Sequence, residues 1–317
     1  PAPIVKKPSS IMKSVDGGKT WEFKSKTDSK MNLNTIDVLS MSVNPQNGQN
    51  IFVGTLKNGI LKTEDGGENW SALVFPAEKV YGLVNDYSDG RIIYASGVYK
   101  ERGKIFKSSN SGVDWDEIYT APSDGPLIIA MANDRRNSNT LFAATSDEQL
   151  LKSTDAGVSW KNVYTSKSPI TKISIDSGNS NIIYINTQSG YFLTSRDGGK
   201  IFESSSIKGN VSFITTDPKD GGVAYAAGKT GLLKSRDAGG SWEELKPLGD
   251  PDSFPVKVVA VSPANSQEIV YGAGQAIYKS VDGGTNWMTS QLETEKNIGI
   301  VMYDINDPNI LYLGLKK

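Results

Sequence analysis

Short runs of apolar and β-branched residues alternate along the chain with turn-forming residues, and this pattern predicts strands from one end to the other. Seven of the runs usually contain a small residue and are typical of buried strands: IFVGT, IIYASG, LFAAT, IIYINT, VAYAAG, IVYGAG and ILYLG. Each follows another apolar or alternating run that ends in residues favouring turns. Nothing reads as a long amphipathic helix, so an all-β fold is expected.

A second pattern recurs in phase with the strands: Ser or Thr, an acidic turn with Gly, and usually Trp. Its seven copies begin at residues 14, 63, 108, 153, 195, 235 and 280, between 40 and 49 residues apart. That spacing is the length of a four-stranded propeller blade. In one repeat the strands are predicted at Val38–Val43, Ile51–Thr55 and Ile60–Thr63, with an outer strand from Trp70. We therefore expect a seven-bladed β-propeller with four antiparallel strands per blade.

The two ends of the chain carry complementary parts of one blade. Residues 11–23 hold a third strand, a copy of the turn and a fourth strand, whereas residues 298–301 and 310–315 hold a first and a second strand. Pairing them closes the ring and removes an exposed sheet edge. The expected organisation is an extended leader at 1–9 and one propeller at 10–317, with blades at about 35–78, 79–123, 124–167, 168–206, 207–250, 251–293, and 294–317 plus 10–26.

Each residue type in the repeated turn has a structural reason. Asp or Asn can accept backbone N–H groups, Gly adopts positive φ without strain, and the Ser or Thr hydroxyl adds a local hydrogen bond. Trp packs a large surface between blades and keeps an indole N–H for a partner. A catalytic group would be needed once, not in every blade. We expect structural roles for Asp16, Asp65, Asn110, Asp155, Asp197, Asp237 and Asp282, and for Trp21, Trp70, Trp115, Trp160, Phe202, Trp242 and Trp287.

The turn pattern SxDxGxxW resembles the Asp-box, also called the bacterial neuraminidase repeat. This repeat occurs in sialidases, xyloglucan-degrading propellers, the sortilin ectodomain and a photosystem II assembly factor family, and here it covers nearly the whole chain. The assembly factor family is similar in blade number and size and carries a functional arginine patch. That resemblance suggests a basic patch as an alternative binding site, formed by Arg135, Arg136, Arg196 and Arg236.

Composition excludes several kinds of chemistry. Lys plus Arg number 34 and Asp plus Glu number 35, so no global field would attract nucleic acid. The chain has no Cys and no His, which excludes thiolate nucleophiles, His-based triads and Cys- or His-ligated metals. No apolar run approaches the roughly 18 to 20 residues of a membrane span. We expect no metal and no cofactor.

Two enzymatic alternatives follow from the resemblance. A sialidase would need an arginine cluster and a Tyr and Glu pair, and most of the six arginines here lie in turns on one face. A xyloglucanase-like glycosidase needs two suitably spaced carboxylates, but those relatives use two tandem propellers and this chain has material for one. No catalytic residue is predicted, and a carbohydrate-active propeller, lectin-like or hydrolytic, is the alternative function.

Loops that break the repeat are the best candidates for function. Residues 97–104, 146–149 and 247–255 form such loops on the face opposite the repeated turns. We predict a monomeric, non-catalytic binding or assembly scaffold that engages a protein partner there, through Tyr99, Lys100, Arg102, Asp147, Glu148 and Phe254. Three prolines among the first eight residues also suggest a tether and export to the periplasm, a lumen or the cell surface, after removal of an upstream signal or lipid-anchored segment.

Overall fold

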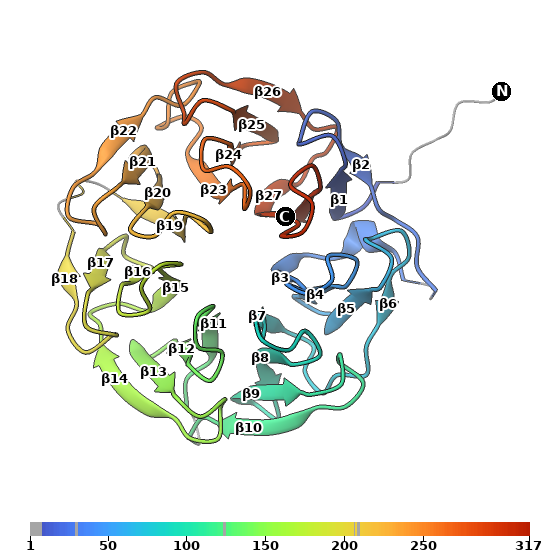
Figure 1. Ribbon diagram of the computed structural model, residues 1–317. Coiled ribbons are helices and arrows are strands. Elements are labelled where there is room, and N and C mark those ends of the chain that lie inside the picture. The colour runs from blue at the N-terminus through green and yellow to red at the C-terminus, as the bar shows by residue number, and fades with distance from the viewer. Residues whose placement is uncertain (1–7, 29–30, 123–124, 206, 208–209) are drawn as a thin grey trace.

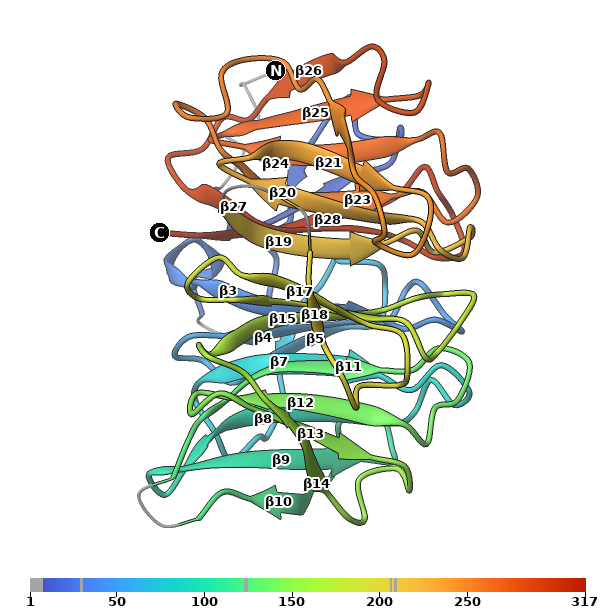
Figure 2. The same ribbon diagram turned by 90° about the vertical axis from the view of Figure 1, so that its left-hand side faces the viewer.

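Seven four-stranded antiparallel sheets form a ring in the computed structural model (Figure 1). The structure describes residues 8–28, 31–122, 125–205, 207 and 210–317. Consecutive strands of a sheet follow one another outward from the ring axis, and Figure 2 shows the strands running from one face of the ring to the other. The predicted seven-bladed, all-β architecture is confirmed. Among the described residues, no helix has the length and hydrophobicity to cross a membrane.

The first three complete blades follow the short 3-10 helix η1 (Leu33–Thr35). From the axis outward, their strands are β3 (Val38–Val43), β4 (Ile51–Thr55), β5 (Ile60–Thr63) and β6 (Ser71–Ala72); β7 (Val80–Asn85), β8 (Ile93–Tyr99), β9 (Arg102–Ser108) and β10 (Asp116–Thr120); and β11 (Ile128–Asn133), β12 (Leu141–Thr145), β13 (Gln149–Ser153) and β14 (Lys161–Thr165). Strands β3, β4 and β5 have the predicted bounds, and β6 begins one residue after Trp70.

Three further blades complete most of the ring. Their strands, again from the axis outward, are β15 (Ile170–Ile175), β16 (Ile183–Thr187), β17 (Phe192–Ser195) and β18 (Glu203–Ser204); β19 (Val211–Thr216), β20 (Ala224–Gly228), β21 (Gly231–Ser235) and β22 (Glu243–Leu245); and β23 (Val256–Val261), β24 (Ile269–Ala273), β25 (Ala276–Ser280) and β26 (Met288–Gln291).

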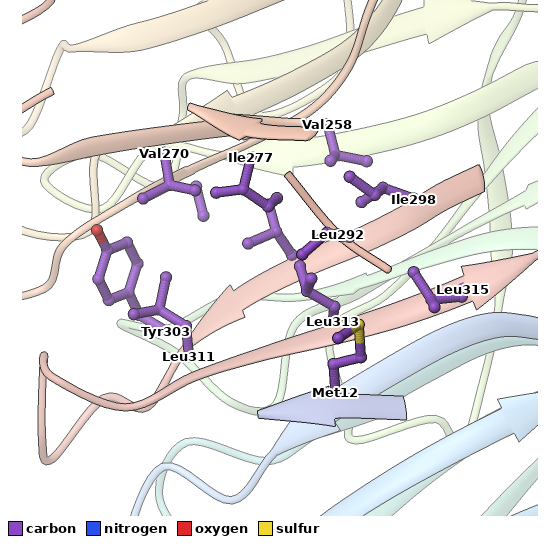
Figure 3. Close-up of a cluster of buried hydrophobic side chains, with 12 residues drawn as sticks. Met12, Val258, Val270, Ile277, Leu292, Ile298, Tyr303, Leu311, Leu313 and Leu315 are labelled. Carbon is purple, nitrogen blue, oxygen red and sulfur yellow. The ribbon is translucent and has the colours of Figure 1, made fainter. Parts of the chain in front are cut away.

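The seventh blade is closed by both ends of the chain, as predicted. Its strands are β27 (Asn297–Tyr303), β28 (Leu311–Lys316), β1 (Ile11–Ser14) and β2 (Glu22–Phe23). Antiparallel pairing places Met12 of β1 opposite Leu313 of β28. Both side chains are buried in a core that also contains residues of β23, β24 and β25 (Figure 3). The seam is therefore held by backbone pairing and by a shared apolar core, which the hydrophobic effect stabilises.

The predicted leader, residues 1–9, includes one residue that packs against the propeller. Ser9, the last residue of the expected leader, is buried, and its Oγ donates a hydrogen bond to the Lys24 carbonyl at 2.7 Å. Leader residues 1–7 and the expected blade limits at 123, 124 and 206 lie outside the described residues. The other limits stay predictions.

Two faces of the ring are distinguished below. The Asp-box face carries the repeated turns 14–21, 63–70, 108–115, 153–160, 195–202, 235–242 and 280–287 together with the turns that leave the innermost strands. The loop face carries the turns between second and third strands and the connections between blades, such as residues 246–255.

A buried polar residue directly follows each innermost strand on the Asp-box face. The residues that follow these seven strands are Asn44, Asp86, Asp134, Asp176, Asp217, Ser262 and Asp304, and none is more than 5% exposed. Several of them reach the neighbouring blade: Asp176 Oδ2 accepts the Gly222 N–H at 2.7 Å, and Asp217 Oδ1 accepts the Ser266 hydroxyl at 3.0 Å. These hydrogen bonds tie adjacent blades together near the axis.

Candidate functional site

The acidic side chains of the Asp-box turns accept several hydrogen bonds within their own hairpins. In the turn that begins at Thr63, the threonine Oγ1 donates to Asp65 Oδ1 at 2.7 Å and accepts the Gly67 N–H at 2.9 Å. Asp65 also accepts the Asn69 N–H at 2.9 Å and its side-chain amide at 2.6 Å. Both hydroxyl bonds recur in all seven turns. The turn acids hold their own hairpins, as the pattern predicts.

Hydrogen bonding also keeps these carboxylates ionised. Hydrogen bonds from Ser159, Ser241 and Asn286 lower the pKa of Asp155, Asp237 and Asp282, respectively, to about 2. At Asp16 and Asp65 burial acts to raise the pKa, but hydrogen bonds from Thr20 and Asn69 outweigh it and leave each value at about 2. A carboxyl whose pKa lies near 2 stays ionised and is poorly suited to be a general acid or base near neutral pH.

The turn aromatics pack between blades, with two exceptions to the regular pattern. The indole N–H of Trp21, Trp70, Trp115, Trp160 and Trp242 donates to the carbonyl of the turn glycine three residues earlier. Trp115 packs edge to face on Phe75 of the preceding repeat at 4.9 Å between ring centroids. Only Trp70 is fully buried, and the other indoles are half-buried. The exceptions are Phe202, which has no N–H, and Trp287.

Trp287 is redirected by a one-residue shift of a buried tyrosine. In six blades the second residue of the second strand is aromatic: Phe52, Tyr94, Phe142, Tyr184, Tyr225 and Tyr312. In β24 the tyrosine is the third residue, Tyr271, so it points to the opposite side of its sheet. There its hydroxyl accepts the Leu248 N–H at 3.0 Å and its ring packs on Trp287 at 4.7 Å. The Trp287 indole in turn donates to the Lys246 carbonyl at 3.1 Å.

These contacts anchor the irregular connection 246–255 on the loop face. The contacts hold the backbone at Lys246 and Leu248. Leu248 is nevertheless 48% exposed, and Phe254 is 61% exposed. Phe254 lies beside Gly274 of the β24–β25 turn, and Pro251 lies beside Gly231, the first residue of β21. Asn210 packs on Gly190, beside Tyr191 of the β16–β17 turn, which is 57% exposed. The exposed side chains thus belong to loops of three neighbouring blades on the loop face.

We call Tyr191, Leu248 and Phe254 the apolar loop group. The sequence predicted Phe254 but missed Tyr191 and Leu248. Tyr191 stands where the corresponding turns have Gly59 and Gln149, so an aromatic residue at a turn position was the signal that could have identified it. Leu248 lies within the loop that the sequence did single out.

The other predicted partner residues lie elsewhere on the loop face and have local contacts. Arg102, at the start of β9, donates through Nε to the Ala121 carbonyl at 2.7 Å. The Tyr99 ring has the ammonium groups of Lys100 and Lys104 at 5.2 and 5.5 Å from its centroid. These residues belong to the blade of β7–β10, on the opposite side of the ring from β23–β26 and hence from Phe254 (Figure 1).

Asp147 and Glu148 shape the β12–β13 turn. Asp147 accepts hydrogen bonds from the Thr145 hydroxyl and from Gln149 Nε2, and Glu148 has a φ of 76°. The six candidate residues thus lie in three separate loops of the loop face, and their roles stay predictions.

The four arginines of the alternative basic patch are spread over the Asp-box face. Arg196 lies 3.3 Å from Glu203 and Arg236 lies 3.0 Å from Glu243. Arg135 donates to the Pro218 carbonyl at 2.8 Å, and its guanidinium carbon lies 5.7 Å from the centroid of the Tyr87 ring. Arg136 is exposed. Two of the four charges are therefore neutralised by neighbouring glutamates, and the patch stays a prediction.

Residues of all seven innermost strands line a cavity of about 530 Å³ on the ring axis. Among the described residues that line it, Arg135 and Lys172 are the only charged ones. No group of three or more Asp or Glu side chains suited to a metal ion occurs in the described ranges of the chain.

Comparisons with known proteins agree with the repeat. The family model for the photosynthesis system II assembly factor YCF48 matches residues 168–312. A structure of YCF48 bound to a D1 peptide is 16% identical, with a TM-score of 0.68 over 89% of this chain and 94% of that chain. YCF48 from Cyanidioschyzon merolae is 14% identical, with a TM-score of 0.65 over 88% and 95%. No curated protein matches the chain in sequence.

Two glycoside hydrolases share the fold as well. The GH74 xyloglucanase from Xanthomonas campestris is 18% identical, with a TM-score of 0.74, and this chain covers 51% of it. The GH74 enzyme from Niastella koreensis is 19% identical, with a TM-score of 0.71, and 53% of it is covered. The chain thus spans about half the length of these GH74 structures, and their likeness shows the fold alone. Its seven Asp-box turns, its seven four-stranded blades and the family match over residues 168–312 support the resemblance to the Asp-box, or BNR-type, seven-bladed propellers.

Proposed function

We propose that this propeller is a non-catalytic scaffold that binds a protein partner through the apolar loop group. The observation that carries the proposal is the exposure of Tyr191, Leu248 and Phe254, between 48 and 61%, on loops of three neighbouring blades on one face. Apolar and aromatic side chains gathered on an exposed surface are typical of protein interaction sites. The likeness to YCF48, whose structure was solved with a D1 peptide, supports a polypeptide as the kind of ligand.

Occupied carboxylates support a role without catalysis. A glycosidase needs two free carboxyl groups at a suitable separation, whereas the acids of the Asp-box turns are engaged in their own hairpins. The carbohydrate-active alternative has support from the GH74 likeness only at the level of the fold. Export and the monomeric state stay predictions.

The test measures binding of a fluorescently labelled D1 peptide by anisotropy. The wild-type chain is expected to bind the peptide, and Tyr191→Ala combined with Phe254→Ala should weaken binding about tenfold or more, because truncated aromatic hot spots typically reduce affinity by that factor. The matched control is Val113→Ala with Val158→Ala, which removes exposed apolar side chains from two turns of the Asp-box face.

Equal weakening by both pairs, or by neither, would contradict the assignment of the site. If the wild-type chain does not bind the D1 peptide, the same two pairs are compared for retention of a partner purified from the source organism with the wild-type chain. Circular dichroism of each variant checks that the fold is intact.

A further inference from the structure

The axial cavity contains one charged group that the fold leaves without a partner. Lys172 is the third residue of the innermost strand β15 and is among the residues that line the cavity. Its ammonium has no hydrogen bond or ion pair within the described residues. The Nζ atom lies 5.2 Å from the centroid of the Phe213 ring. Lysines near the seam differ: Lys296 Nζ donates to Ser10 Oγ and to the Ile36 carbonyl, both at 2.7 Å.

Lys172 is exposed, but to the interior of the ring. The corresponding third residues of β3, β7 and β11 are Ser40, Gly82 and Ala130, which are small and buried. Lys172 is much longer, so its side chain extends beyond them into the cavity. The surrounding blades partly desolvate the ammonium, which lowers the pKa of Lys172.

An unpaired ammonium that projects into a cavity inside the ring is available to an anionic ligand. The cavity itself supplies none, since no described lining residue is Asp or Glu. Arg135, the other lining cation, is held at the Asp-box end by Pro218 and Tyr87. An anion entering the cavity would therefore find Lys172 as its free ionic partner.

The remaining lining favours an apolar body on that anion. Partly exposed apolar side chains line the cavity at Leu39, Ile129, Met131, Phe213, Ile300 and Met302. A volume of about 530 Å³ lies within the range of roughly 300 to 1,000 Å³ that is typical of small-molecule sites.

We propose that the axial cavity binds a small amphipathic carboxylate, with its anionic head at Lys172 and its hydrocarbon chain along the apolar lining. A carboxylate matches the ammonium through a charge-assisted hydrogen bond. This site is separate from the apolar loop group, because it uses the innermost strands at the axis rather than the loops of one face.

The probe is decanoate, and binding to the full chain is measured by isothermal titration calorimetry. One molecule of decanoate should bind per chain. The neutral analogue decanol should bind with an affinity at least about tenfold lower, because it lacks the ionic contact. Lys172→Met should weaken decanoate binding by a similar factor, whereas Lys172→Arg retains the charge and should keep most of the affinity.

Lys257→Met is the matched control, since Lys257 is an exposed lysine of the innermost strand β23 that does not line the cavity; it should bind as the wild-type chain does. The variant Tyr191→Ala with Phe254→Ala should also keep full decanoate affinity, which separates this site from the partner site.

Failure of the wild-type chain to bind decanoate, or equal affinity in the wild-type chain and Lys172→Met, would overturn the proposal. So would equal losses in Lys172→Met and Lys257→Met. Thermal unfolding checks each variant, and Lys172→Gln replaces Lys172→Met if the latter fails to fold.

Discussion

The two faces of the ring use the same repeat in opposite ways. On the Asp-box face, each of the seven turns forms the same two hydrogen bonds: the Ser or Thr hydroxyl accepts a glycine N–H and donates to the Asp or Asn side chain. On the loop face, one turn is fixed by Arg102, another by Asp147, and the connection 246–255 leaves Leu248 and Phe254 exposed. A side chain that recurs in every blade stabilises that blade, whereas the candidates for recognition are found where the blades differ.

The largest expected difference between the faces concerns their aromatic side chains. Trp70→Ala should lower the free energy of unfolding by about 3 to 5 kcal/mol, because it removes a fully buried ring. Trp160→Ala should lower it by less, about 1 to 2 kcal/mol, since that ring is half-buried. Phe254→Ala on the loop face should change it by no more than about 0.5 kcal/mol. Urea unfolding measures all three, and a Phe254 variant as unstable as Trp70→Ala would break the comparison.

A smaller difference is expected between serines of the two faces. Ser153 is buried, and Ser153→Ala leaves the buried Gly157 N–H without its acceptor, which should cost about 1 to 3 kcal/mol. Ser253 on the loop face donates to Asp250 in an exposed position, so Ser253→Ala should cost no more than about 0.5 kcal/mol. Equal unfolding midpoints for the two variants would show that the turn hydroxyl has no special role.

The turn acids should act as hydrogen-bond acceptors more than as charges. Asn110 already replaces Asp in one turn and accepts both the Ser108 hydroxyl and the Asp114 N–H. Asp65→Asn should therefore leave stability almost unchanged near neutral pH, whereas Asp65→Ala should lower it by about 1 kcal/mol. The result that counts against this role is an Asp65→Asn variant as unstable as Asp65→Ala.

Acid should weaken the Asp-box turns gradually. The pKa of Asp16, Asp65, Asp155, Asp237 and Asp282 is about 2 in the folded chain, below the value of about 3.9 for an unfolded aspartate. A lowered pKa contributes stability that is present above pH 4 and is lost as the pH falls toward 2. Urea unfolding between pH 5 and 2.5 should show this decline, with a shallower slope in Asp65→Asn. Identical slopes would assign the decline to other groups.

Much of the fold could be predicted because the same physical requirement recurs in each blade. The bounds of β3, β4 and β5 and the pairing of β1 with β28 agree with the sequence patterns. The hydrogen bonds between blades formed by Asp176 and Asp217 were not predicted. These residues occupy the same position in each repeat, but that position varies among Asp, Asn and Ser. Their role depends on contacts with the next blade, which local patterns do not contain.

The candidate site was less predictable, because it depends on exceptions. Tyr271 is displaced by one residue from its counterparts, and only the three-dimensional structure shows that its hydroxyl binds Leu248 of the preceding connection. Tyr99 and Arg102 have the residue types of a binding site, yet the structure gives them local partners. Lys172 could not be predicted as a site residue, because a single lysine in a strand is usually exposed to bulk solvent. Its position in the axial cavity depends on all seven innermost strands.

Hydrogen–deuterium exchange with and without bound peptide tests the central claim most directly. If the loop face is the binding surface, the D1 peptide or the purified partner should slow exchange in residues 188–191 and 247–255 and leave the seven Asp-box turns unchanged. Protection confined to the Asp-box turns would contradict the account, because it would place recognition on the face where every blade is alike.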